Sequence, residues 1–509
     1  MQDRTQNAAR NVIFGALLKA YQILIPFIMR TIIIYLLGAE YAGLSSLFTS
    51  ILQVLNLAEL GVGAAMVYSM YKPIAENDSA RICALLKMYK IYYRIIGMVI
   101  AAVGIALTPV IPRLVKGEVP SDINLITLYY LNLGAVVVSY WLFAYKSSLL
   151  QAHQRADVVS KVVIVTNTLQ YLLQFVVLFA FRNYYYFVIV ALATQVISNI
   201  ATAVAATKMY PDYQPCGELD VKEKIIINNK IKDLFFIRIG SIVVDSVDSI
   251  VISAFLGLTM LAVYQNYFYI MNSVYMLVCT VFTAIVASVG NSLITESDEK
   301  NYSDFKTLTF IMSAIICVCC NCFVGLYQPF MKMWVGETLM LEFPFVILLC
   351  VYFYVRLTAS IWNVPKDAAG LWHSDRYRAL VAAGVNLTLN LIFVNIMGLY
   401  GILLSTIIAV LFISCPWILH NVFKYIYKRS MKRYLLKIAE YALCSIVSCL
   451  ISYFACGFLH LEGILGLVER LIATVIISCC MILILFSRTE EWNRGMRLAV
   501  KMLKRGAHE

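Results

Sequence analysis

Residues 12–38 read VIFGALLKAYQILIPFIMRTIIIYLLG, and this stretch determines how the rest of the chain is interpreted. It is apolar enough to span a bilayer, yet it contains Lys19, Gln22, Pro26 and Arg30. These side chains follow one another at steps of three, four and four residues, which places all of them on one face of a helix. Pro26 removes a backbone hydrogen bond in mid-span and therefore predicts a bend or hinge.

The cationic face of this segment indicates the kind of substrate. A cation near the middle of a lipid-facing helix costs about 2.5–3.5 kcal/mol, so we expect this face to line a protein cavity. A polar, cationic stripe inside a bilayer predicts a passage for an anion. The alternative is that Lys19 and Arg30 each extend to the nearer membrane surface. Arg30 is followed by eight more residues of the segment, which makes that alternative weaker for Arg30 than for Lys19.

The composition excludes a soluble globular protein. The chain has 509 residues, of which 61% are hydrophobic and 14% charged, and its mean hydropathy is +0.80. Such a chain has too little polar surface to cover itself in water, so the expected fold is an all-α polytopic membrane protein. Residues 1–10 are polar and no cleavage site follows the first apolar run, so we expect no cleaved leader.

Hydropathy and turn residues predict about fourteen membrane spans. They lie near residues 12–37, 42–70, 85–110, 123–145, 157–181, 185–207, 234–256, 260–288, 306–331, 342–365, 377–395, 398–423, 435–459 and 464–486.

The distribution of basic residues predicts the orientation of these spans. With a cytoplasmic N-terminus, 33 of the 41 Lys and Arg residues fall on the inner side, four in the outer loops and four within spans. This asymmetry predicts an even number of spans and a cytoplasmic location for both termini. The net charge of +12 therefore reflects membrane orientation, and no nucleic-acid partner is expected.

An internal repeat divides the predicted spans. The Leu-Gly pair at residues 37–38 recurs at residues 256–257, and Asn167 recurs as Asn386, each 219 residues later. A constant offset with spans and loops in phase predicts two six-helix lobes in parallel pseudo-repeat. The predicted organisation is an N-terminal lobe at residues 1–210, a cytoplasmic amphipathic linker at 211–233, a C-terminal lobe at 234–424, two extra transmembrane helices at 425–487 and a basic cytoplasmic tail at 488–509.

The second span adds polar residues to the first lobe. Gln53, Asn56 and Glu59 lie within a sequence that continues into Gly61 and Gly63, which we expect to permit close helix packing. Glu59 can pair with a cation of the first span and neutralise it when no ligand is bound. A purely structural ion pair is an equally good interpretation.

The second lobe is acidic where the first is basic. Ser241, Asp245 and Asp248 share one face of the predicted seventh span, because they follow one another at steps of four and three. Two carboxylates at that depth need a counter-charge, which a proton, a metal cation, Arg356 or Arg238 can supply. A buried ion pair with Arg356 is the structural alternative to a role in transport.

Two further residues supply oxygen ligands of the same type. Asn363 and Asp367 are four residues apart near the end of the tenth span. Carboxylate and amide oxygens suit Na⁺, and protonated carboxylates suit coupling to H⁺. Asp367 lies beside Lys366 near the membrane surface, so a structural ion pair is the stronger interpretation for that residue.

Aromatic and sulfur-containing residues are abundant. The segment around Tyr264 and Asn266 is more polar than a lipid-facing helix tolerates, so we expect it to line the cavity and stack on sugars. His153 and His373 occupy equivalent inner loops and are interpreted as loop residues. Cysteines concentrate at residues 317–322, where helix packing is a better interpretation than a metal or redox site.

Nothing in the sequence resembles an enzyme site. There is no phosphate-binding Gly-Lys-Ser/Thr loop, no plausible zinc set and no extramembrane segment large enough to bind a nucleotide. We therefore expect no cofactor beyond a coupling ion, Na⁺ or H⁺.

Three short motifs carry a family resemblance. LLGAEYAGL at residues 36–44, LAELGVG at 57–63 and YKPIA at 71–75 resemble bacterial polysaccharide-unit flippases of the multidrug/oligosaccharidyl-lipid/polysaccharide exporter superfamily. The resemblance covers essentially the whole chain. It implies a flippase that moves an undecaprenyl-pyrophosphate-linked oligosaccharide from the inner to the outer leaflet, with the polysaccharide polymerase and glycosyltransferases as partners.

The resemblance also implies roles for individual residues. Lys19 and Arg30 would hold the pyrophosphate. Related lipid II flippases bind sodium through an Asp on helix seven and an Asn-x-x-x-Asp pair on helix eleven; Asn363 here belongs to the tenth predicted span. The predicted substrate-binding residues are Lys19, Gln22, Arg30, Gln53, Asn56, Glu59, Tyr264, Asn266 and Arg356, and the predicted ion-coupling residues are Asp245, Asp248, Asn363 and Asp367.

Two other functions compete with this one. An ion-coupled exporter of drugs or organic cations has the same expected fold, but it favours an anionic cavity, whereas the first lobe here is cationic. A membrane polysaccharide polymerase or acyltransferase usually needs a large outer loop or a buried catalytic histidine, and the sequence shows neither.

Overall fold

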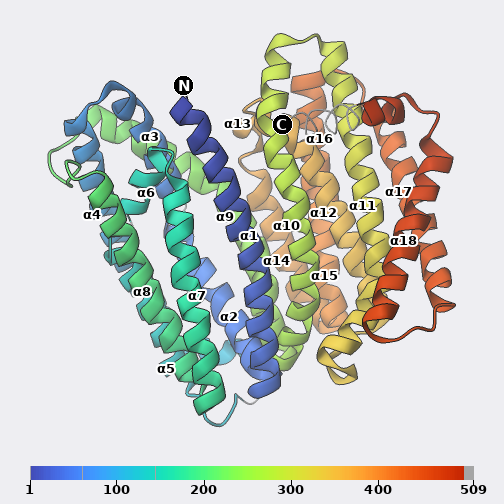
Figure 1. Cartoon of the computed structure of the whole chain (residues 1–509), viewed down its shortest axis with the longest axis horizontal. Helices are drawn as coiled ribbons and strands as arrows, with labels where there is room; N and C mark the ends of the chain where they lie inside the picture. The colour runs from blue at the N-terminus through green and yellow to red at the C-terminus, as the bar shows by residue number, and fades with distance from the viewer. Residues whose placement is uncertain (1, 60, 118, 144, 498–509) are drawn as a thin grey trace. The chain divides into compact units, whose positions relative to one another are not determined.

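The computed structural model describes residues 2–59, 61–117, 119–143 and 145–497. These residues form helices and connecting loops without any strand, which confirms the predicted all-α class (Figure 1). The chain separates into two compact units, Met1–Gln265 and Asn266–Glu509, and each is described by itself.

The first unit begins with two long helices joined at Gly38 and ends inside α10. Its elements are α1 (Gln2–Leu36), α2 (Ala39–Leu55), η1 (Asn56–Glu59), α3 (Val62–Glu76), α4 (Ser79–Leu107), η2 (Thr108–Leu114), α5 (Leu125–Trp141), α6 (Tyr145–Ala152), α7 (Ala156–Phe181), α8 (Tyr184–Met209), α9 (Val221–Leu256) and the first turns of α10 (Leu258–Thr295).

The second unit contains the rest of α10 and all later elements. These are α11 (Asp298–Val335), η3 (Glu337–Leu339), α12 (Phe343–Ala368), α13 (Trp372–Asp375), α14 (Arg378–Met397), α15 (Leu399–Ile408), the π-helix η4 (Ala409–Ser414), α16 (Cys415–Asn421), the π-helix η5 (Val422–Tyr427), α17 (Lys432–Gly457) and α18 (Gly463–Phe486).

The protein is a multi-pass membrane protein. Within the described part of the chain, ten helices are long and apolar enough to cross a membrane, or eleven if the bent pair α5 and α6, at 52°, is one span. The predicted spans at 42–70, 234–256 and 260–288 fall on α2 to α3, on α9 and on α10. The fold is therefore the one predicted, and the count of fourteen remains a prediction consistent with it.

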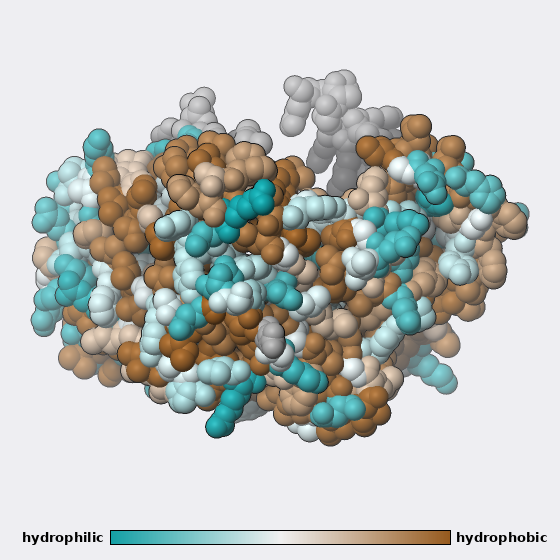
Figure 2. Space-filling model, turned by 90° about the horizontal axis from the view of Figure 1, so that it is seen from below, coloured by the Kyte–Doolittle hydropathy of each residue, from teal (hydrophilic) through white to brown (hydrophobic). Residues whose placement is uncertain are grey.

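Hydrophobic side chains dominate the surface of the spanning helices. On α7, Leu172 is 61% exposed and Phe179 is 54% exposed, as expected for side chains that face lipid. Figure 2 looks along the helices onto one end, where hydrophilic side chains lie among the hydrophobic ones. Such a mixture is typical of the level at which loops leave the bilayer.

The backbone supports the internal repeat. Gly38 and Gly257, 219 residues apart, both adopt positive φ, at 122° and 92°. Gly117 and Gly336, at the same offset, do so at 88° and 76°. A side chain at these positions would be strained, so each glycine fixes the turn between two helices. The turns at matching positions therefore share the same backbone feature, a glycine at positive φ. The lobe boundaries remain predictions.

Buried polar side chains join equivalent helices in both units. Thr166 of α7 donates to Ser198 of α8 at 3.2 Å, and Asn386 of α14 donates to Thr406 of α15 at 2.9 Å. Thr166 and Asn386 are 220 residues apart, and both side chains are buried. Paired polar groups of this kind satisfy one another where no water is available.

The connection between the lobes differs in detail from the prediction. A loop follows α8, and then residues 221–256 form the single helix α9, so the second half of the predicted linker is continuous with the following span. No proline and only one glycine, Gly240, occurs between Val221 and Leu256, which explains why the helix does not break.

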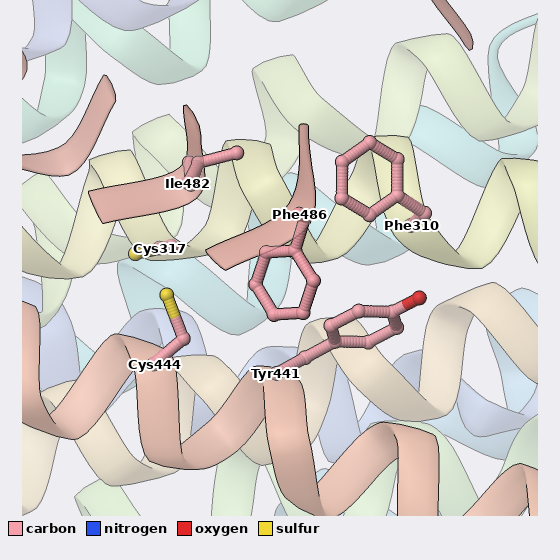
Figure 3. Close-up of a cluster of buried hydrophobic side chains, with 6 residues drawn as sticks. All are labelled: Phe310, Cys317, Tyr441, Cys444, Ile482 and Phe486. Carbon is pink, nitrogen blue, oxygen red and sulfur yellow. The ribbon is translucent and has the colours of Figure 1, made fainter. Parts of the chain in front are cut away.

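The last two helices pack against α11. Figure 3 shows Phe310 and Cys317 of α11 against Tyr441 and Cys444 of α17, with Ile482 and Phe486 of α18 completing the cluster. One turn further along α11, the buried Asn321 accepts hydrogen bonds from Ser448 at 3.0 Å and Ser452 at 2.6 Å of α17. Both apolar and polar contacts therefore attach α17 to the second unit.

Candidate substrate-binding site

Arg30 connects three helices of the first unit. Its guanidinium donates from Nη1 to Ser46 Oγ of α2 at 3.2 Å and from Nη2 to the Ala262 carbonyl of α10 at 3.0 Å. Both acceptors are neutral oxygens, and the two bonds orient the guanidinium. The side chain is partly buried.

The helix that carries Arg30 is held by an apolar cluster beside it. Met29 and Ile33 of α1 are buried against Ala42 of α2 and Ala262 of α10. α1 continues as a helix through Pro26 and does not end there. Arg30 follows Met29 directly in sequence, so its side chain lies on the helix face next to the apolar cluster. That neighbouring face is the polar one.

Lys19 and Gln22 lie on the half of α1 that precedes Pro26. Both side chains are exposed, and both belong to the same helix face as Arg30. The structure thus places the three members of the predicted stripe along one helix, two of them exposed and one packed against α2 and α10.

Glu59 has different partners from those predicted. Its Oε2 accepts from Tyr140 at 2.6 Å, and its Oε1 accepts from Tyr93 at 3.1 Å. Tyr140 lies 3.3 Å from Asn56 Oδ1, so the two predicted residues of η1 do come together. The carboxylate is therefore bound by tyrosine hydroxyls rather than by a cation of α1, because η1 lies against α4.

Stacked rings support these hydroxyls. The Tyr93 ring stacks on Tyr140 with centroids 5.8 Å apart and on Tyr89 with centroids 5.9 Å apart. Tyr89 in turn donates to the Gly63 carbonyl at 2.9 Å. Sequence analysis missed these tyrosines. Tyr89 and Tyr93 are one helical turn apart, and this spacing could have shown that they share a helix face. Tyr140 is distant in sequence and carries no such signal.

The break between α2 and α3 is packed closely against α9. Gly61 adopts φ +89°, and a Cβ there would lie 2.8 Å from the Ile231 carbonyl. This contact confirms that Gly61 permits close packing. Gln53 of α2 accepts a hydrogen bond from the buried Ser246 of α9 at 3.2 Å.

The predicted acidic pair lies on α9. Asp248 is 7% exposed, so its side chain is buried within the predicted seventh span. The side chains of Asp245, Ser241 and Arg238 lie outside the described residues. Tyr264 and Asn266, on α10, are buried at 2% and 0% exposure and are thus part of the packed interior of their units.

Arg356 is surrounded by tyrosines in the second unit. Its guanidinium lies 4.2 Å from the ring centroid of Tyr275 of α10, and Nη1 donates to the Tyr352 hydroxyl at 3.0 Å. Tyr275 also shares a 3.2 Å hydrogen bond with Ser360. Aromatic faces stabilise a cation by their quadrupole, so the charge is retained inside the span. Tyr352 precedes Arg356 by one turn, a spacing that could have identified it.

Asn363 and Asp367 have different surroundings. Asp367 is 46% exposed and forms an ion pair with Lys366 at 3.1 Å, whose Nζ also donates to Asp375 at 2.7 Å. Asn363 donates to the Ala359 carbonyl, and its Oδ1 is buried without a hydrogen-bond partner. Among the described residues, no group of three or more His, Cys, Asp or Glu side chains is arranged to hold a metal ion.

The loop around His153, predicted to lie on the inner side, is packed with aromatic rings. His153 stacks on Tyr210 at 4.1 Å and on Tyr213 at 5.6 Å, and its Nε2 is buried without a hydrogen-bond partner. Burial lowers the pKa of His153 below its ordinary value. The side chain of His373, the equivalent residue, lies outside the described part of the chain.

An apolar groove of about 550 Å³ lies within the second unit. It is formed by α11, α12 and α17, and its walls include Cys320, Ile347, Cys350, Tyr354 and Leu450. All three helices that form it are apolar enough to cross a membrane.

These features define a polytopic all-helical membrane protein with polar and charged side chains inside its spans. No protein-family model matches the chain, and no curated protein matches its sequence. Its fold is shared by a lipid II flippase, MurJ, in an inward closed conformation. The two are 14% identical with a TM-score of 0.67, over 94% of this chain and 99% of that chain.

Transporters of the multidrug resistance MATE family share the fold as well. One, in an inward-facing conformation, is 15% identical with a TM-score of 0.59, over 78% of this chain and 93% of that chain. A mutant of the Vibrio cholerae MATE transporter VcmN is 12% identical with a TM-score of 0.55, over 84% of this chain and all of that chain. At such identities these similarities establish the fold.

Proposed function

We propose that this protein is a flippase that moves an undecaprenyl-pyrophosphate-linked oligosaccharide from the inner to the outer leaflet of the bacterial plasma membrane. The observation that carries the proposal is the stripe of Lys19, Gln22 and Arg30 on α1, with Arg30 held in mid-span by two neutral oxygens. Keeping cations within the hydrocarbon region is costly, so a helix that retains them is expected to use them on an anion.

The pyrophosphate is the anion that suits this stripe. Arg presents several N–H donors in a fixed plane and forms charge-assisted hydrogen bonds to phosphate oxygens. Lys19 is exposed and adds a second charge about three turns away on the same helix face. Gln53, Asn56 and Glu59 supply polar groups beyond it on α2 and η1, and Glu59 is already oriented by two tyrosines.

Two features of the second unit suit the other parts of the substrate. Arg356, oriented by Tyr275 and Tyr352, offers N–H donors for the hydroxyl groups of a sugar. The apolar groove formed by α11, α12 and α17 suits a hydrocarbon chain that stays in the bilayer. We infer that the two lobes alternate in opening to each leaflet, so that only the head group crosses.

Asp248 is the residue that we propose for ion coupling. Asp248 is buried in a predicted span, where an ionisable side chain is suited to binding a proton or a cation. Asp245 remains a candidate from the sequence. Asp367 is not retained for this role, because it is exposed and paired with Lys366.

An exporter of drugs or organic cations is the second candidate, because MATE transporters share the fold. A cationic stripe disfavours a cationic substrate, since like charges repel. A polysaccharide polymerase is the third and weakest candidate.

Reconstituted vesicles distinguish the three functions. The purified protein is placed in vesicles that contain a labelled undecaprenyl-pyrophosphate oligosaccharide, and a membrane-impermeant glycosidase reports the sugar that reaches the opposite leaflet. We expect protein-dependent crossing without any change in sugar chain length. The same vesicles loaded with a fluorescent organic cation are expected to retain it. Efflux of the cation without crossing of the lipid would overturn the proposal, as would longer sugar chains.

A further inference from the structure

The first three turns of α9, residues 221–232, have two sharply different faces. One face docks onto the rest of the first unit. Arg81 of α4 donates to Glu223 Oε1 from Nε at 2.8 Å and from Nη2 at 2.6 Å, and Tyr92 donates to Asn228 at 2.6 Å. Ile227, between these two polar contacts, is 2% exposed. This docking fixes which residues face outward.

The outward face is both apolar and basic. We name it the α9 outer face and define it by Val221, Lys222, Ile225, Ile226, Asn229 and Lys232. At 100° per residue these six side chains occupy one side of the helix, opposite Glu223 and Ile227. Val221 is 66% exposed, Ile225 54% and Ile226 56%, and the other three side chains are exposed as well.

An exposed cluster of branched apolar side chains flanked by lysines is unfavourable in water. Fully burying one such side chain is worth about 1.5–3 kcal/mol, and leaving three exposed together forgoes that gain. Two of the three are isoleucines at consecutive positions, and each of them is more than half exposed.

The α9 outer face lies near the bilayer surface, because α9 continues into a predicted membrane span. The same helix continues into the span predicted to begin at residue 234. At about 1.5 Å per residue, Lys232 lies within one turn of that point and Val221 within about 20 Å. Basic loop charge assigns this end of the span to the cytoplasmic side, where acidic lipids give the leaflet a negative surface potential.

The geometry points to the α9 outer face as a binding surface for acidic phospholipids of the adjacent leaflet. Ile225 and Ile226 enter the boundary between head groups and acyl chains, and Lys222 and Lys232 contact the lipid phosphates. The opposite face stays attached to α4 through Glu223 and Asn228, so the membrane contact orders a helix that also packs against Gly61. This inference is independent of the transported substrate.

Charge complementarity excludes a neutral lipid as the preferred occupant. Each lysine near an anionic surface is worth about 1 kcal/mol, which corresponds to about a five-fold preference. The acidic side chain on this segment that could oppose the effect, Glu223, is bonded to Arg81 and lies on the docked face.

Native mass spectrometry of the full-length protein tests the proposal. The protein is released from nanodiscs that contain equal amounts of phosphatidylglycerol and phosphatidylcholine, and the retained lipids are counted. We expect the double variant Lys222→Gln with Lys232→Gln to lose preference for phosphatidylglycerol by about five-fold for each lysine. The matched control is Lys116→Gln with Lys332→Gln, which removes the same charge from exposed lysines of the predicted outer loops.

The outcomes separate a lipid surface from its alternatives. Equal preference in the α9 double variant and the wild type would overturn the proposal. Equal loss in both double variants would also overturn it, because net charge would then explain the effect. Ile225→Ser with Ile226→Ser is expected to lower retention of both lipids, and unchanged retention would show that this face does not enter the bilayer. An unchanged unfolding midpoint establishes that each variant remains folded.

Discussion

At the scale of single residues, the groups packed around a charged side chain determine how that charge is held inside a span. Arg30 and Arg356 illustrate this, because one is held by neutral oxygens and the other by tyrosine rings. Sequence alone predicted that both arginines lie within spans. It did not predict their partners, since Ala262 is 232 residues from Arg30 and contributes only a backbone carbonyl, which carries no sequence signal.

His153 predicts a pH dependence of stability. Its pKa is lowered by burial, so below its ordinary value of about 6.5 the unfolded chain binds a proton that the folded chain does not. Stability that is present above pH 6.5 is therefore lost as the pH falls. His153→Phe keeps the stacking on Tyr210 and removes the titration, so its unfolding midpoint is expected to fall less than that of the wild type between pH 7.5 and pH 5.5.

The control for this prediction is His460→Phe, at an exposed loop position. That variant is expected to keep the wild-type slope. Parallel curves for wild type and His153→Phe would show that His153 does not contribute to the loss.

At the scale of helices, the sequence located the spans well and their internal breaks poorly. The predicted span 157–181 agrees with α7, and 464–486 agrees with α18, because hydrophobic runs bounded by polar loops are a strong signal. The predicted span 42–70 is instead α2, η1 and α3, broken at Gly61. A glycine in an apolar run does not by itself show whether the helix breaks there. Its neighbour in space, here Ile231, has to be known first.

The attachment of α17 to α11 depends on Asn321. Asn321→Ala removes the oxygen that accepts from Ser448 and Ser452, and each buried hydroxyl left unpaired costs about 1–3 kcal/mol. We expect a lower unfolding midpoint in detergent, measured by loss of helical circular dichroism. The triple variant Asn321→Leu, Ser448→Ala and Ser452→Ala removes both hydroxyls together with their acceptor and is expected to recover much of the loss. If the triple variant is as unstable as the single one, unpaired hydroxyls are not the cause.

At the scale of the whole molecule, the resemblance found in three short motifs agrees with the fold shared with MurJ and MATE structures. The repeat was visible in the sequence because the glycines that fix its turns, such as Gly38 and Gly257, cannot be replaced without strain. The roles of the site residues were less predictable. Asp367 has the right spacing from Asn363 for an ion site, but Lys366 binds it at the surface.

The central claim is that a cation held inside the bilayer binds the anionic head group during its passage. Crossing of the labelled lipid-linked oligosaccharide in reconstituted vesicles tests it most directly when wild type is compared with Arg30→Ala, Arg30→Lys and Arg470→Ala. Arg470 is the control, because it also lies in a predicted span but donates to the carbonyls of Leu459 and Leu461.

A hydrogen bond from a charged donor is worth about 1.5–3 kcal/mol, so Arg30→Ala is expected to slow crossing by about 10- to 150-fold. Arg30→Lys keeps the charge and is expected to be intermediate, while Arg470→Ala stays near the wild-type rate. Crossing by Arg30→Ala at the wild-type rate, with equal amounts of folded protein in the vesicles, would contradict the account.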